Sequence, residues 1–109
     1  MTDVDIKLPE FSDTHAVVTA IEDVCAKEAL IVSMKSTLKK YPGCIHWHFK
    51  RHNERGVLEL TWWPCSEAMK PARLWLSAHS NRKAEWMQRL MPRLKTLIEE
   101  ALAVQGQRS

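Results

Sequence analysis

Apolar and polar residues alternate along three segments of the chain between Cys44 and His79. An alternation of period two is typical of a β-strand that buries one of its faces. It predicts strands over about residues 44–51, 57–63 and 73–79. The side chains expected on the buried face are Ile45, Trp47, Phe49, Leu58, Leu60, Trp62, Leu74, Leu76 and Ala78.

The opposite, outer face of these strands carries an unusual mixture of polar and aromatic side chains. By parity it should present His46, His48, Lys50, Glu59, Thr61, Trp63, Arg73, Trp75 and Ser77. Tryptophans exposed together are costly without a partner. The outer face is therefore the candidate functional surface.

The connection between the first two strands predicts how they pair. Residues 53–56, Asn-Glu-Arg-Gly, have the composition of a four-residue hairpin loop that ends on a left-handed glycine. The loop would place His52 opposite Val57. The outward pairs of this register are Lys50 with Glu59, His48 with Thr61, and His46 with Trp63.

Helical spacing of apolar residues marks the region before the strands. Residues 14–40 are predicted to form one helix, or two with a break near Lys27, with Ser12 or Asp13 as the N-cap. The β-branched pair at residues 31–32 also permits a short strand. Residues 1–12 are expected to be a loosely ordered arm or an added edge strand.

The strongest helical pattern follows the third strand and predicts a helix over about residues 82–104. Ser80 or Asn81 is the expected cap. Pro92 falls inside the pattern, so the helix should kink there or end and restart. Residues 105–109 lack an apolar pattern and are expected to fray.

These elements predict an α+β fold. The inner face of a three-stranded antiparallel meander would pack on the C-terminal helix and on the N-terminal helical region. With 109 residues, 45% of them hydrophobic and 27% charged, the chain fits a single domain, expected over residues 13–104.

Cysteine spacing and hydropathy indicate where in the cell this domain is expected. The three cysteines, Cys25, Cys44 and Cys65, are widely spaced and form no CxxC, which argues against a disulfide framework and a zinc ribbon. No apolar run has the length of a membrane span, and the first ten residues lack the pattern of a secretion signal. A cytoplasmic location without membrane contact is the expectation.

Charge is distributed unevenly along the chain. Residues 41–96 contain ten Lys or Arg against four Glu, a local excess of six, within a net charge of +3. Such an excess favours an anionic partner. The cations at the predicted helix start make Ser80, Asn81, Arg82 and Lys83 a candidate anion-binding group.

His46 and His48 form an HxH pair whose imidazoles should share one strand face. Such a pair can hold zinc if another strand supplies a third ligand. Glu59 is the nearest candidate, with His79 and Cys44 further away, but the predicted register gives Glu59 to Lys50. No ligand set is complete, so no metal site and no cofactor are assigned, and a histidine metal site stays a third-ranked alternative.

The outer face is interpreted as the contact region of a non-catalytic binding module. Its partner would be another protein or a second copy of the chain, with nucleic acid or another anion as the alternative. If helices covered this face, its tryptophans would be ordinary core residues. No glycine-rich phosphate loop or hydrolase motif supports an enzyme. The candidate contact residues are Trp63, Trp75, His46, His48, Lys50 and Arg73.

Overall fold

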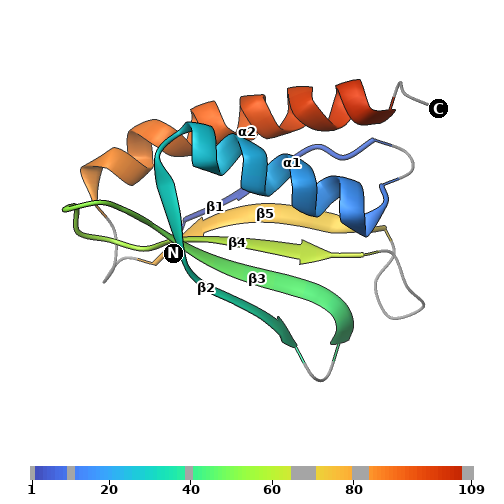
Figure 1. Cartoon of the computed structure of the whole chain (residues 1–109), viewed down its shortest axis with the longest axis horizontal. Coiled ribbons are helices and arrows are strands. Elements are labelled where there is room, and N and C mark those ends of the chain that lie inside the picture. The colour runs from blue at the N-terminus through green and yellow to red at the C-terminus, as the bar shows by residue number, and fades with distance from the viewer. Residues whose placement is uncertain (1, 10–11, 39–40, 65–70, 80–83, 107–109) are drawn as a thin grey trace.

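The computed structural model describes residues 2–9, 12–38, 41–64, 71–79 and 84–106. Within these ranges, five antiparallel strands form one sheet, in the order β1-β5-β4-β3-β2, and two helices pack on it (Figure 1). The elements in chain order are β1 (Thr2–Asp5), α1 (Thr14–Lys27), β2 (Leu30–Leu38), β3 (Tyr41–Arg51), β4 (Leu58–Trp63), β5 (Arg73–Ala78) and α2 (Glu85–Gly106).

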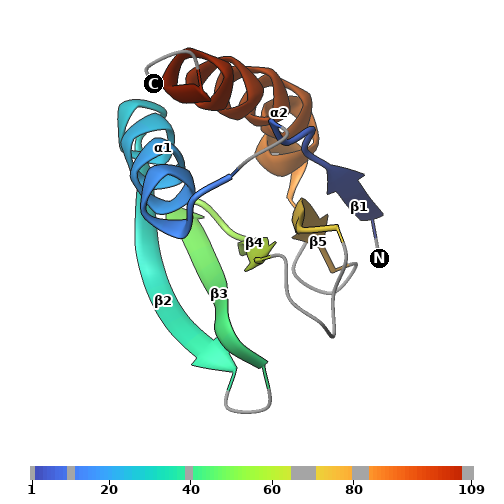
Figure 2. The same ribbon diagram turned by 90° about the vertical axis from the view of Figure 1, so that its right-hand side faces the viewer.

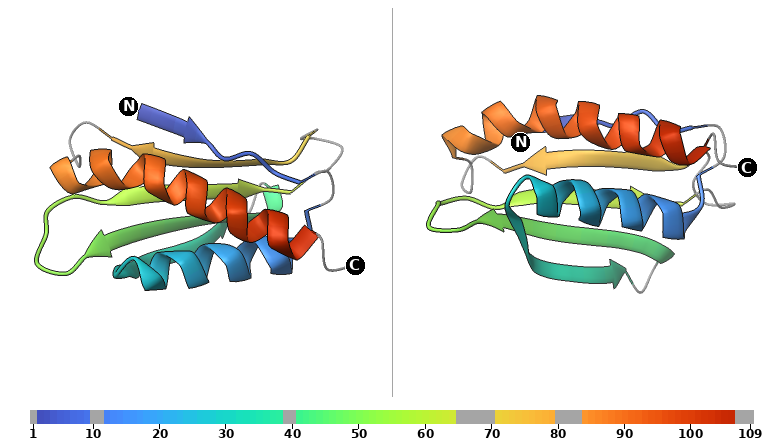
Figure 3. Two further views of the ribbon diagram at one scale, coloured as in Figure 1. Left: turned by 90° about the horizontal axis from the view of Figure 1, so that it is seen from above. Right: turned by 45° about the horizontal axis from the view of Figure 1, so that its top comes forward.

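The fold has two layers, because both helices lie on the same face of the sheet (Figure 2). They run side by side across it (Figure 3). The predicted α+β class is therefore confirmed, with five strands in place of three. Helix α1 packs on the inner face beside α2, as predicted, so the alternative in which the N-terminal helices cover the outer face is wrong.

The core lies between the helices and the inner face of the sheet. Eight of the nine predicted inward side chains are buried, and Ile45 is half-buried. They pack with apolar residues of both helices, including Val17 and Ile21 of α1 and Leu94 and Ile98 of α2. The alternation of the sequence was thus a correct guide to which side of each strand faces the core.

Tryptophan N–H groups in this core are satisfied by polar atoms at its rim. The Trp47 indole donates to Glu22 at 3.1 Å, and the Trp62 indole donates to the Thr14 hydroxyl at 3.2 Å. A buried donor without a partner would cost about 1–3 kcal/mol. These contacts also tie α1 to β3 and β4.

Residues 14–38 form one helix followed by a strand, rather than helix alone. Helix α1 begins after Asp13, whose carboxylate accepts a hydrogen bond from the Ala16 N–H at 3.1 Å, as the capping prediction required. The helix ends before Ala29, which has a left-handed φ of 62°. The chain then turns back as β2, so the short strand left open at residues 31–32 is a nine-residue edge strand.

The first strand and the last helix also differ from the predicted elements. Residues 2–5 form β1, an edge strand paired with β5. Helix α2 begins at Glu85, later than expected, and continues through Pro92 to Gly106. Among the described residues, neither helix combines the length and apolar character needed to cross a membrane.

The predicted hairpin register is wrong by two residues. Arg51 accepts a hydrogen bond from the Glu54 N–H at 3.0 Å, which closes the turn earlier than expected, and Asn53 takes a left-handed φ of 61°. Moving both strand ends back by one residue changes each cross-strand partner by two. The faces are preserved because the strand period is two. The observed outward pairs are His46 with Thr61 and His48 with Glu59.

An exposed ion pair joins α2 to the end of α1. The Arg93 guanidinium donates to both oxygens of Glu28, at 2.6 and 3.4 Å. This hydrogen bond lowers the pKa of the Glu28 carboxyl below its ordinary value. A lowered pKa in the folded state means that the contribution to stability is present near neutral pH and is lost in acid.

We expect a Glu28→Gln variant to lose less stability than the wild type as the pH falls below about 4.5, where carboxyl groups of this kind take up protons. Urea unfolding midpoints measured between neutral pH and pH 3 check this. Arg93→Gln is the matched control and should flatten the acid dependence similarly. An equally steep loss of stability in all three proteins would contradict it.

Candidate metal centre

Two rows of directly opposite residues cross the outer face of the sheet, the face that α1 and α2 do not cover (Figure 2). One row consists of Met34, His48, Glu59, Ser77 and Asp3, from β2 to β1. The next consists of Ser36, His46, Thr61, Trp75 and Asp5. Glu59 therefore lies beside His48 and diagonal to His46, in the middle of the sheet.

Glu59 is a buried carboxylate on the face that α1 and α2 leave uncovered. Only 6% of its surface is exposed, and its neighbours Thr61 and Ser77 are equally buried. Burying a charged group is costly unless other groups replace the lost water. The side chains around Glu59 must therefore supply that compensation.

Three imidazoles surround this carboxylate. The Nε2 atoms of His46 and His48 lie 2.9 and 3.3 Å from Glu59 Oε1. His79 follows the last residue of β5, and its Nε2 atom lies 2.8 Å from the other oxygen, Oε2. Residues from three adjacent strands, or directly after them, thus converge on one side chain.

The two histidines of the HxH pair also approach each other. Their Nε2 atoms are 3.1 Å apart, and both face Glu59 Oε1. At most one of them can place a hydrogen in the space between them, since two N–H groups would repel. His46 Nδ1 lies 2.8 Å from the Thr61 hydroxyl, which can donate or accept and so suits either tautomer.

This arrangement has the dimensions of a metal-binding site. The ligand atoms of His46, His48 and Glu59 all lie within 4.8 Å of one another. Neighbouring ligand atoms in a tetrahedral zinc site with bonds of 2.0–2.2 Å are about 3.3–3.6 Å apart. The separation of 3.3 Å lies at the edge of this range, and those of 2.9 and 3.1 Å are slightly shorter, so small side-chain movements would admit an ion.

The observed register removes the reason against a metal site, which was the predicted pairing of Glu59 with Lys50. Lys50 lies opposite Ile31 of β2 and is exposed, so Glu59 is not its partner. Cys44, the other distant ligand considered, is buried, and burial raises the pKa of its thiol. Glu59 and His79 were considered as third ligands but were not assigned, because the predicted register placed Glu59 opposite Lys50.

The aromatic contact residues lie on the same face, along its β4–β5 side. Trp63 and Trp75 are half-buried and meet edge to face, with ring centres 6.0 Å apart. The Arg73 guanidinium lies 4.2 Å from the centre of the Trp75 ring and donates to Asp5 at 2.8 Å. The face therefore has a histidine-carboxylate part and an aromatic part.

The candidate anion-binding group cannot be placed in the same way. Ser80, Asn81, Arg82 and Lys83 lie outside the described residues, as does Cys65. The candidate thus remains a prediction from sequence.

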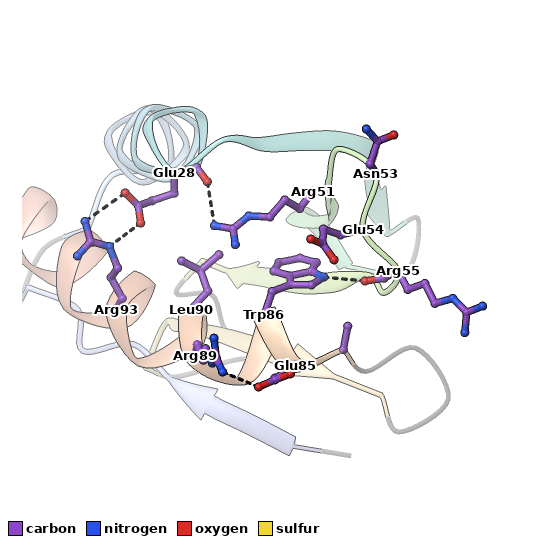
Figure 4. A pocket seen from close by; sticks show the side chains of 11 residues that line it. Glu28, Arg51, Asn53, Glu54, Arg55, Glu85, Trp86, Arg89, Leu90 and Arg93 are labelled. Carbon is purple, nitrogen blue, oxygen red and sulfur yellow. Dashed lines mark hydrogen bonds and ion pairs between the residues drawn. The ribbon is translucent and has the colours of Figure 1, made fainter.

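A pocket of about 700 Å³ opens at the other end of the molecule, between α2 and the β3–β4 hairpin (Figure 4). Four arginines line it, and three of them have internal partners. Arg93 binds Glu28, Arg89 binds Glu85, and Arg51 packs over the Trp86 ring at 5.3 Å from its centre. The pocket therefore lies where α2 packs against the end of α1 and the β3–β4 hairpin.

Comparisons of the chain with protein-family models, with curated proteins and with solved structures found no match.

Proposed function

We propose that this protein binds a divalent transition-metal ion on the outer face of its sheet, through His46, His48 and Glu59. The observation that carries the proposal is the convergence of two imidazole nitrogens on one oxygen of a buried carboxylate, at 2.9 and 3.3 Å. Ligands of one ion must approach one another in this way, and the ion would replace the proton that they otherwise share.

The donor atoms indicate which ions fit. Two imidazoles and a carboxylate suit zinc and other first-row transition ions. Calcium and magnesium prefer sites made entirely of oxygen atoms. Zinc is therefore the reference ion for the proposal, and cobalt is its spectroscopic substitute.

The contacts of His46 and the position of the ligands in the sheet also support metal binding. When His46 binds a metal through Nε2, its Nδ1 atom must carry the hydrogen, and the Thr61 hydroxyl at 2.8 Å can accept it. Hydrogen bonds of this kind fix the orientation of metal-binding imidazoles. The ligands also lie on β3 and β4, which are flanked by other strands on both sides, so the site rests on a rigid part of the fold.

We expect the wild type to bind one zinc ion per chain in isothermal titration calorimetry. Removal of both imidazoles in His46→Ala/His48→Ala, or of the carboxylate charge in Glu59→Gln, should weaken binding by at least about 100-fold, since each change removes ligands directly.

His52→Ala is the matched control, because His52 lies in the hairpin and is exposed. It should bind zinc like the wild type. Absence of stoichiometric binding, or equal affinity in the control and in the ligand variants, would contradict the proposed function.

The aromatic part of the face supports a second candidate, docking of a protein partner or a second copy of the chain. The specific observation is the Trp63–Trp75 pair with Arg73 stacked on it, since tryptophan and arginine dominate the binding energy of protein interfaces.

For this candidate, a Trp63→Ser/Trp75→Ser variant should keep its fold and lose any self-association of the wild type. Sedimentation equilibrium measures the association, and circular dichroism checks the fold. An unfolded variant would show that the two rings are part of the core, and an unchanged association state would remove them from the interface.

A further inference from the structure

We infer that His79 is a ligand of the same ion, so that the complete set is three imidazoles and one carboxylate. This inference rests on the proposed metal-binding function and extends it. It concerns the side of Glu59 that faces away from the HxH pair.

The second carboxylate oxygen of Glu59, Oε2, lies on that side. The atom is fully buried and accepts no hydrogen bond from the described residues, although His79 Nε2 lies only 2.8 Å away. The two atoms are close without the alignment of a hydrogen bond. The pair is therefore not held together by a well-aligned hydrogen bond, and a small side-chain movement would give it the spacing of two ligands of one ion.

The carboxylate provides the link between the two sides of the site. His46 and His48 flank Oε1, whereas His79 flanks Oε2. An ion held by both oxygens of Glu59 would therefore have an imidazole beside each oxygen. Carboxylates bind metals through one or both oxygens, and zinc accepts five ligand atoms as well as four.

His79 is not in the group of described residues whose ligand atoms already lie within 4.8 Å of one another, so its side chain must move to reach the ion. It lies immediately after the end of β5, and its side chain is 43% exposed, compared with 24% for His46. The two histidines of β3 are fixed within a strand, whereas His79 is the adjustable member. Its recruitment would join β3, β4 and the end of β5 through one ion.

The number of protein ligands bears on what the centre does. Structural zinc sites are filled by four residues, whereas catalytic sites use three and keep a position for water. With His79 in place, four residues hold the ion. The centre is then a filled one, suited to stabilising the outer face rather than to activating water.

The competing role for His79 is to orient Glu59 from outside the coordination sphere. Cobalt absorption separates the two roles. In a His79→Cys variant loaded with cobalt, a thiolate bound to the ion would give an intense charge-transfer band in the near ultraviolet. His79→Ser is the matched control, because it has similar size and no thiolate.

We expect the band in His79→Cys and its absence from His79→Ser and from the wild type, together with at least a tenfold loss of cobalt affinity in His79→Ser. Cobalt binding by His79→Cys without this band would overturn the inference and leave a three-residue site. A wild type that shows no visible absorption with cobalt would instead contradict the proposed function itself.

Discussion

A carboxylate that has lost almost all of its water constrains the outer face of this protein. Glu59 is 6% exposed in the middle of a sheet face that α1 and α2 leave uncovered. The cost of burying its charge is met by imidazoles on both sides, at 2.8 to 3.3 Å. Protons or a metal ion can supply the positive charge that this arrangement needs. A metal ion also explains why the two Nε2 atoms lie 3.1 Å apart beside one oxygen, because two N–H groups pointing into the space between them would repel each other.

The fold holds this cluster in place through ordinary packing. The inward residues of β3 and β4, among them Trp47 and Leu60, are fully buried against the helices. Their burial fixes the parity of each strand, and parity sends His46, His48 and Glu59 to the opposite face. The same core contacts that stabilise the protein therefore position the ligands. The aromatic pair Trp63 and Trp75 shares that scaffold, which makes the outer face a surface with two chemically distinct parts.

The sequence predicted the faces of the strands and the C-terminal helix, because both depend on local periodicity. It did not predict the pairing of β3 with β4, because that depends on a turn in which Asn53, rather than Gly56 alone, adopts a left-handed conformation. The resulting two-residue difference set Glu59 opposite Lys50, so the sequence supported a metal site only as a third-ranked alternative. Local periodicity also does not determine β2. Its residues Ile31, Val32 and Met34 are exposed on an edge strand, so their apolar character does not indicate a buried strand face. His79 could be placed beside Glu59 only once the pairing of β4 with β5 was known.

The most direct test of the account is the location of a bound ion in crystals of the protein grown with zinc. Anomalous scattering measured on both sides of the zinc absorption edge identifies the element and its position. The account predicts one strong peak about 2.0–2.2 Å from the Nε2 atoms of His46 and His48 and from a carboxylate oxygen of Glu59. A zinc-free cluster with the same side-chain positions, or zinc bound only elsewhere on the chain, would contradict it.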